Sequence, residues 1–291
     1  MGFLSSLLPR QLVGLDIGVS GIKAVEIAGK KEKRLMAYNR IALPMDTMSP
    51  EGEIRNRHNL VEALAKLFAG KNFSSKKVAI GAFGNSIMTK KISVPKMTAN
   101  EFSNQLYFEA EQYIPFNVNE VNMDFAILGN STNTSATTPM MDVLLIAAKK
   151  DYIGQLRGAV DEAGLTVDVV DSQAFALGNV FEFNYGLQLR QAPSGMANVI
   201  IDFGAGGTKL SVVEKDKTTF TRELRQSGIS CTNAIAERLG LSFSEAEQRK
   251  ISDYESKEVG QVIHDFCGTL AEEVGRTLDF YLSQSTEKTI E

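Results

Sequence analysis

Two short stretches of the chain carry residue types that bind phosphate and divalent metal, and both follow one pattern. The first reads LDIGVSGIKAVEI from Leu15, and the second reads IDFGAGGTKLSVV from Ile201. The matched residues are Asp16, Gly18, Gly21 and Lys23 in the first copy and Asp202, Gly204, Gly207 and Lys209 in the second. One such turn is typical of an ordinary hairpin, whereas two copies in the same phase predict two related domains.

The chemistry that this pattern favours is the binding of a polyphosphate with its metal ion. Glycine permits a positive φ and a close approach of the backbone, and the free N–H groups of a tight turn form a nest for an anion. An aspartate at the end of the first strand repels a phosphate but holds Mg²⁺, usually through water. We therefore expect two hairpins that clamp a polyphosphate from both sides, or, as the alternative, two turns without a ligand.

Two other kinds of phosphate site do not fit these stretches. The segment GAGGTK lacks the spacing of a P-loop, and the LSVV that follows it is typical of a strand. A dinucleotide fold places its glycine loop at the start of a helix, but IKAVEIA alternates as a strand does.

The elements that must position these turns can be located from hydrophobic periodicity. Strands are predicted on both sides of each turn, with a further hairpin strand over RLMAYNRIAL and a buried strand over KKVAIGAFG. Helices are predicted over Asn59–Ala69, with Asn59 as the cap, over 98–114, with a Thr98/Glu101 capping box, and over 256–283. Phe102, Leu106 and Tyr113 in the second helix either belong to a core or line a groove, and their periodicity favours a core.

Bulk composition excludes several classes of protein. A length of 291 residues suggests about two domains, and a net charge of −4 without tryptophan gives no reason to expect nucleic-acid binding. The two cysteines, Cys231 and Cys267, form no CxxC motif, and His58 and His264 have no neighbouring ligand residues, which argues against a zinc site. No apolar run approaches the ~20 residues of a membrane span.

Taken together, the two stretches resemble the phosphate motifs of the actin-like ATPase superfamily, which includes actin, Hsp70, sugar kinases and FtsA. Longer phrases resemble one family within it, the PilM proteins of type IV pilus assembly. These phrases are VGLDIGVSGIKAVEI, EAEQYIPFNVNEVNMDF, VLLIAAKKDYI, AGLTVDVVDSQAFALGN and SGISCTNAIAERLGLSFSEAEQRK. They are spread over most of the chain, and EAEQYIPF with its following Asp-Phe is the most specific of them.

The resemblance implies an α/β actin-like fold with two related domains and an inserted α+β subdomain of the FtsA type, called 1C. The implied subdomains are 1A over 1–85 and 166–190, 1C over 86–165, 2A over 191–226 and 2B over 227–291. The family continues with a strand, a Gly-Gly loop over the adenosine and a last helix. The resemblance therefore implies a chain truncated at its C-terminal end, without the adenosine loop.

The resemblance also implies a nucleotide site for ATP and Mg²⁺. Asp16 and Asp202 would position the metal, and Asp171 or Gln173, at the start of the connecting helix, would orient a water. Glu247 and Lys250, in AEQRK, match the family's A-E-x-x-K near the ribose and adenine, although the pair is otherwise an ordinary solvated one. The implied phosphate-binding residues are Gly18, Ser20, Gly21, Lys23, Gly204, Gly206, Gly207 and Thr208. Turnover is expected to be weak or absent.

Family members are cytoplasmic and peripheral to the bacterial inner membrane. The resemblance implies an adaptor that binds the N-terminal tail of the membrane protein PilN and links the PilN/PilO complex to the pilus motor ATPases. Three alternatives stay open: a small-molecule kinase, an FtsA-like filament protein of cell division, and a scaffold without nucleotide. The kinase would turn ATP over rapidly with a sugar, and the FtsA-like protein would form filaments that sediment with ATP.

Overall fold

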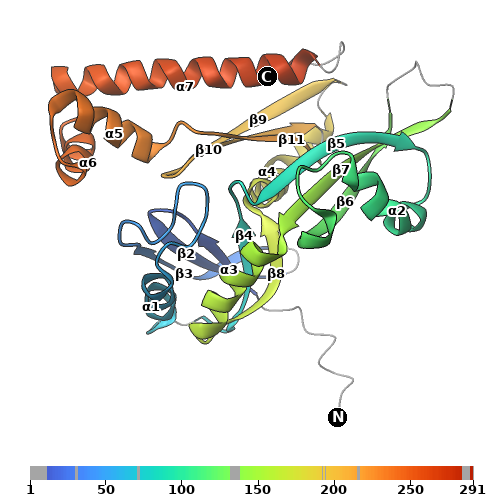
Figure 1. The fold of residues 1–291 in the computed structure, drawn as a ribbon, viewed down its shortest axis with the longest axis horizontal. Helices are drawn as coiled ribbons and strands as arrows, with labels where there is room; N and C mark the ends of the chain where they lie inside the picture. Colours follow the sequence, from blue (N-terminus) through green and yellow to red (C-terminus); the bar gives the residue numbers. More distant parts are fainter. Residues whose placement is uncertain are drawn as a thin grey trace. The chain divides into compact units, whose positions relative to one another are not determined.

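The computed structural model describes residues 12–29, 32–70, 73–131, 138–191, 193, 195–214, 217–283 and 289–290. The chain divides into two compact units (Figure 1). Unit 1 consists of Met1–Ile87 and Lys149–Gln173, and unit 2 consists of Met88–Ala148 and Ala174–Glu291. Among the described residues, no helix combines the length and the hydropathy that crossing a membrane requires.

Unit 1 is built on a five-stranded sheet in the order β3-β2-β1-β4-β8. Its strands are β1 (Val13–Ile17), β2 (Gly21–Ala28), β3 (Arg34–Ala42), β4 (Lys77–Ala82) and β8 (Thr166–Ser172). The first three form the two predicted antiparallel hairpins, whereas β4 is parallel to β1 and β8 is parallel to β4. Alternate residues of β1 and β2 are buried, as their period of two predicts.

Two helices share the hydrophobic core of this sheet: α1 (Arg57–Phe68) and α3 (Lys150–Glu162). The helix α1 begins earlier than predicted, because Asn56 rather than Asn59 is the cap and its side chain accepts the Asn59 N–H. The helix α3 lies in the predicted insertion 86–165, but its buried side chains pack in the core of unit 1. The subdomain bounds stay a prediction.

Unit 2 contains a second sheet, whose four strands are arranged like β3, β2, β1 and β4 of the first sheet. Its order is β11-β10-β9-β12, formed by β9 (Met196–Phe203), β10 (Thr208–Glu214), β11 (Lys217–Leu224) and β12 (Thr289–Ile290). As in unit 1, three consecutive strands form two antiparallel pairs, here β9–β10 and β10–β11. A fourth strand, β12, is parallel to the first of these three strands, β9. This shared order confirms at the level of topology that the two glycine-turned stretches belong to repeated units.

Three helices follow the second sheet: α5 (Gly228–Leu239), α6 (Phe243–Ser252) and α7 (Lys257–Ser283). Each of the first two begins with a serine capping box, from Ser227 and Ser242. Side chains of all three helices form one apolar cluster around Ile235 and Val259. The apolar stripe of α7 extends further, and Leu278 and Tyr281 pack on the core of the sheet.

The inserted segment forms a three-stranded sheet in the order β5-β7-β6, with strands β5 (Ile87–Pro95), β6 (Val121–Asn130) and β7 (Met140–Lys149). The helix α2 (Ala99–Glu111) has the predicted Thr98/Glu101 capping box, and a short 3-10 turn, η1, covers Val118–Glu120. Phe102 and Leu106 are buried in the core of this sheet, which confirms the core assignment for both. The connecting helix α4 covers Gln173–Gln191.

Candidate functional site

The two predicted hairpins have the same backbone geometry. In the β1–β2 turn, the Gly18 N–H donates to the Gly21 carbonyl over 3.0 Å, and in the β9–β10 turn the Gly204 N–H donates to the Gly207 carbonyl over 3.0 Å. Directly before each turn, an aspartate pairs with a lysine across the ladder. These pairs are Asp16 with Lys23 and Asp202 with Lys209. The sequence repeat is therefore also a structural repeat, in which both turns contain the same backbone hydrogen bond.

Close approach of the backbone explains the glycines of both turns. A Cβ on Gly21 would lie 2.7 Å from the Ile41 carbonyl oxygen of β3, and one on Gly204 would lie 2.8 Å from the Gly207 carbonyl oxygen. Both distances are shorter than real Cβ contacts. None of the glycines of the two turns has a positive φ, so that part of the prediction is wrong for these turns.

Each turn presents at least two backbone N–H groups that have no partner within the described part of the chain. They include those of Val19 and Ser20 in the first turn and those of Ala205, Gly206 and Gly207 in the second. The amides of Gly18 and Gly204 are already used inside the turns. Adjacent unpaired amides at a glycine turn form the nest that binds an anion. Ser20, Gly206 and Gly207 are therefore among the predicted residues that offer amides to a ligand.

The side chain of Thr208 is engaged within the protein. It is completely buried, and its hydroxyl donates to the Gln226 carbonyl over 2.6 Å. It thus ties the start of β10 to the segment after β11 and supports the second turn. The predicted role of Thr208 beside a phosphate concerns its backbone amide and stays a prediction.

The aspartate of the first hairpin is held by two side chains from opposite directions. One oxygen of Asp16 accepts from Lys23 Nζ over 2.9 Å, and the other accepts from Gln173 Nε2 over 2.8 Å. The carboxylate is nevertheless 43% exposed, so water or a metal ion can reach it. Gln173, the first residue of α4, thus lies beside the predicted metal ligand, as the resemblance implies.

Strand register explains how Asp16, Gln173 and Asp171 come together. Asp16 of β1 is aligned with Gly81 of β4, and Gly81 is aligned with Asp171 of β8. Gly81 has no side chain in the middle of this row, and a Cβ there would lie 2.9 Å from Gln173 Cγ. The glycine therefore leaves the space through which Gln173 reaches Asp16. Sequence reasoning missed Gly81, because its role depends on strand pairing and no motif marks it.

Burial raises the pKa of Asp171 above its ordinary value of 3.8, and the Ser172 N–H, which donates to it over 2.7 Å, offsets part of this rise. A carboxylate with a raised pKa is a better proton acceptor than an ordinary aspartate, which suits a group that orients or activates water.

The second Asp–Lys pair is looser and more buried than the first. Lys209 Nζ lies 3.7 Å from Asp202, and the lysine side chain is 12% exposed, compared with 68% for Lys23. Lys23 is thus free to reorient toward a ligand, whereas Lys209 is fixed beneath its turn.

The N-terminus of α5 is joined to the second turn by its own amides. The Gly228 N–H donates to the Gly204 carbonyl over 3.0 Å, and the Ile229 N–H donates to the Ala205 carbonyl over 2.9 Å. The next amide, that of Ser230, is capped by the Ser227 hydroxyl. Because these three amides have protein partners, they are not available to an anion, whereas the unpaired turn amides are.

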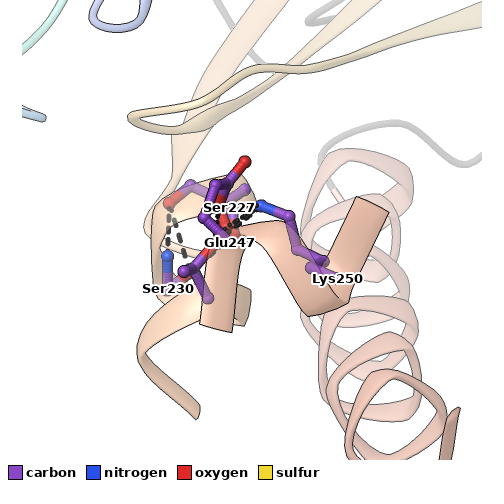
Figure 2. Close-up of polar contacts among 6 residues, drawn as sticks. Ser227, Ser230, Glu247 and Lys250 are labelled. Atoms are coloured by element: carbon purple, nitrogen blue, oxygen red, sulfur yellow. Dashed lines mark hydrogen bonds and ion pairs between the residues drawn. The ribbon is translucent and has the colours of Figure 1, made fainter. Parts of the chain in front are cut away.

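The predicted pair on α6 forms a hydrogen-bonded network with the start of α5 (Figure 2). Lys250 Nζ donates to the Glu247 carboxylate over 2.7 Å, to the Thr232 hydroxyl over 2.7 Å and to the Gly228 carbonyl over 3.0 Å. The Thr232 hydroxyl also contacts the same Glu247 oxygen and the Gly228 carbonyl. Lys250 is therefore linked to the second turn through Gly228, because the Gly228 N–H donates to the Gly204 carbonyl.

The charge of Glu247 is stabilised by this network. Burial alone would raise its pKa, but the hydrogen bonds from Lys250 and Thr232 and the charge of Lys250 hold it below its ordinary value of 4.5. All three N–H groups of Lys250 are used, so the ammonium group supports α5 and the turn. Sequence reasoning missed the completely buried Thr232, because its partners come from a different helix.

The structure thus gathers the predicted residues into two groups. Asp16, Lys23, Asp171 and Gln173 belong to unit 1, with the first turn, and Glu247 and Lys250 lie near the second turn in unit 2. Asp16 and Asp202 belong to different units, so the clamp between the two turns stays a prediction. Within the described ranges, no three His, Cys, Asp or Glu side chains form a metal cluster. A single carboxylate fits Mg²⁺ that arrives with a phosphate ligand and keeps its waters.

Comparisons with known proteins agree with this repeated architecture. The family model described as type IV pilus assembly protein PilM matches residues 14–291. A solved structure described as a PilM-PilN type IV pilus biogenesis complex is 28% identical, with a TM-score of 0.81, and the match covers 95% of this chain and 79% of that chain.

Two more distant structures have TM-scores of 0.49. One is the ethanolamine utilization protein EutJ from Carboxydothermus hydrogenoformans, at 15% identity, with 94% of this chain and 74% of that chain covered. The other is MreB 5 of Spiroplasma citri bound to AMPPNP, at 12% identity, with 94% and 79% covered. The fold is the predicted actin-like ATPase fold, and the chain belongs to the PilM family of type IV pilus assembly proteins.

Proposed function

We propose that this protein is an ATP-binding adaptor of type IV pilus assembly, and that nucleotide binding controls how it holds a partner. The observation that carries the nucleotide part is the pair of equivalent turns, each with at least two unpaired amides beside an Asp–Lys pair. An ordinary hairpin requires none of these features, whereas a polyphosphate uses all of them.

In this proposal, the chain's own residues divide the task of binding Mg-ATP. The unpaired amides of the turns hold phosphate oxygens, and Lys23 neutralises their charge. Asp16 and Asp202 hold the water shell of Mg²⁺, which neutralises charge on the polyphosphate when it is bound. Asp171 accepts a proton from a water that Gln173 helps to orient. Turnover is slow or absent, because binding alone is sufficient for a switch.

We further propose that the partner is the N-terminal tail of PilN. The supporting observation is the similarity over 95% of this chain to a protein described in complex with PilN. Through PilN, the protein would be held at the inner membrane from the cytoplasmic side. Contacts with PilO and with the motor ATPases belong to the same proposal.

The nucleotide site is tested by calorimetric titration of Mg-ATP into the wild-type protein and the Asp16→Ala/Asp202→Ala double variant. We expect at least a tenfold loss of affinity in the variant, because it lacks the carboxylate that precedes each of the two turns. Asp46→Ala is the matched control, since Asp46 is an exposed carboxylate of unit 1 paired with Arg55. Equal affinity of the double variant and the control would refute the assigned roles.

The adaptor role is tested by titration of a peptide with the sequence of the PilN tail, with and without Mg-ATP. We expect the two affinities to differ by about fivefold or more, which is the usual size of coupling between two sites. Binding of the peptide with equal affinity under both conditions would show a scaffold that nucleotide does not regulate.

A further inference from the structure

The strand β11 contacts two parts of unit 2, the second turn and the three-stranded sheet of the inserted segment. It is an edge strand of its sheet, and its side chains contact the three-stranded sheet of the inserted segment. The Thr221 hydroxyl is hydrogen-bonded to the Thr89 hydroxyl of β5. Lys217 Nζ donates to the carbonyl oxygens of Ile127 and Leu128 in β6, over 3.4 and 3.3 Å.

The same strand forms one wall of the second turn. Glu223 Oε1 and the Leu224 carbonyl oxygen lie 3.0 and 3.4 Å from the position that a Cβ on Gly207 would occupy. The buried Leu224 side chain and the bond from Thr208 to the Gln226 carbonyl fix this end of the strand. A displacement of the turn therefore displaces the end of β11.

Thr221, which contacts β5, and Glu223, which lies beside the second turn, are on the same face of β11. Phe220 and Arg222 contact the Phe280 ring of α7, so Thr221 and Glu223 point to the opposite face. Two residues along a strand correspond to about 7 Å, with no flexible segment between them. The helix α4 crosses β11 so closely at Gly178 that a Cβ there would collide with the Thr218 hydroxyl. The strand thus has little freedom to absorb a displacement by bending toward α4.

We propose that β11 transmits the occupancy of the second phosphate turn to the three-stranded sheet, through the contact between Thr221 and Thr89. This inference rests on the proposed function, because the turn must bind nucleotide for there to be a signal. It adds a route that lies entirely within unit 2 and requires no closure of one unit on the other. The inserted three-stranded sheet would then respond to nucleotide through a shift of β5 relative to β11.

Hydrogen exchange with mass spectrometry tests this link on the full chain, with Mg-AMPPNP as the probe. In the wild-type protein, we expect saturating probe to slow exchange over residues 204–208 and, by about fivefold, over β5. In Thr221→Val and in Thr89→Val, the response over 204–208 remains and the response of β5 falls below about twofold. Valine preserves the shape and β-propensity of threonine, and the retained response of the turn shows that the variants are folded.

The double variant Thr89→Val/Thr221→Val provides the internal control. If the two hydroxyls act through their mutual contact, the double variant loses no more of the β5 response than either single variant does. A β5 response that persists in both single variants would overturn the proposed link. A wild-type response over 204–208 without any response of β5 would overturn the link alone. The absence of any response over 204–208 would overturn the nucleotide site and the link together.

Discussion

Two lysines of this chain make nearly the same ion pair in different surroundings. Lys250 Nζ lies 2.7 Å from Glu247, and Lys66 Nζ lies 2.6 Å from Glu62, about one helical turn away in each case. The Lys250 side chain is 20% exposed and makes two further hydrogen bonds, whereas that of Lys66 is 62% exposed. We predict that Lys250→Met destabilises the protein and that Lys66→Met, the matched control, changes its stability very little.

The size of the effect follows from the three bonds of Lys250. A hydrogen bond to a charged group contributes about 1.5–3 kcal/mol, and bonds that share one donor group are not additive. Glu247 remains 38% exposed, so water replaces part of what the carboxylate loses. The expected loss is about 2–3 kcal/mol, which corresponds to a decrease in Tm of about 4–12 °C for a unit of this size.

Scanning calorimetry at neutral pH measures both variants against the wild-type protein. The network also gives the effect a pH dependence with a definite sign. Because the folded-state pKa of Glu247 is below 4.5, its contribution is present above that pH and is lost as the pH falls through the lower folded-state value. The difference between wild type and Lys250→Met should therefore shrink in this acid range. Equal shifts for the two lysine variants at neutral pH would refute the argument that burial makes the pair stabilising.

Three further outcomes are expected. Gly21→Ala should lower the stability by about 1–3 kcal/mol, because its Cβ would lie 2.7 Å from a backbone oxygen of β3. Gly268→Ala, whose Cβ would have no atom within 4 Å, should raise the stability by about 1 kcal/mol. Urea unfolding measures both variants. Asp171→Asn should raise Tm at neutral pH, and this gain should disappear as the pH falls through the raised pKa and should be absent below 3.8. A gain that does not depend on pH would contradict burial as its cause. Thr208→Val should cost about 1 kcal/mol in urea unfolding and Thr208→Ser less, because serine keeps a hydroxyl for the bond to the Gln226 carbonyl.

The sequence was most informative where structure is local. The two turns and the capping box at Thr98 each depend on residues within eight positions of one another, and all of them are present as predicted. The cap of α1 was placed three residues too late, because Asn56 and Asn59 both suit a helix start and only the backbone φ and ψ distinguish them.

Features that depend on tertiary contacts could not be predicted in the same way. The place of Gly81 follows from its register with β1 and β8, and that of Thr232 follows from the packing of α5 on α6. Asp16 and Gln173 were both expected near the metal, but their hydrogen bond to each other depends on the space at Gly81. Likewise, the packing of α3 in unit 1 depends on the apolar residues of that core. The periodicity of α3 indicates which of its faces is apolar but not which sheet that face packs on.

Unit 1 is formed by two separate segments of the chain, and this affects the order in which the protein folds. Its strands β4 and β8 are neighbours in the sheet but are separated along the chain by the whole of 88–148. The insertion returns to its starting point, since the Lys149 N–H donates to the Ser86 carbonyl over 2.9 Å. If the insertion folds first, it shortens the loop that β8 must close and lowers the entropic cost of that closure. During synthesis, we therefore expect the small three-stranded sheet to form before the sheet of unit 1 is complete, and variants that unfold the insertion to slow the folding of unit 1.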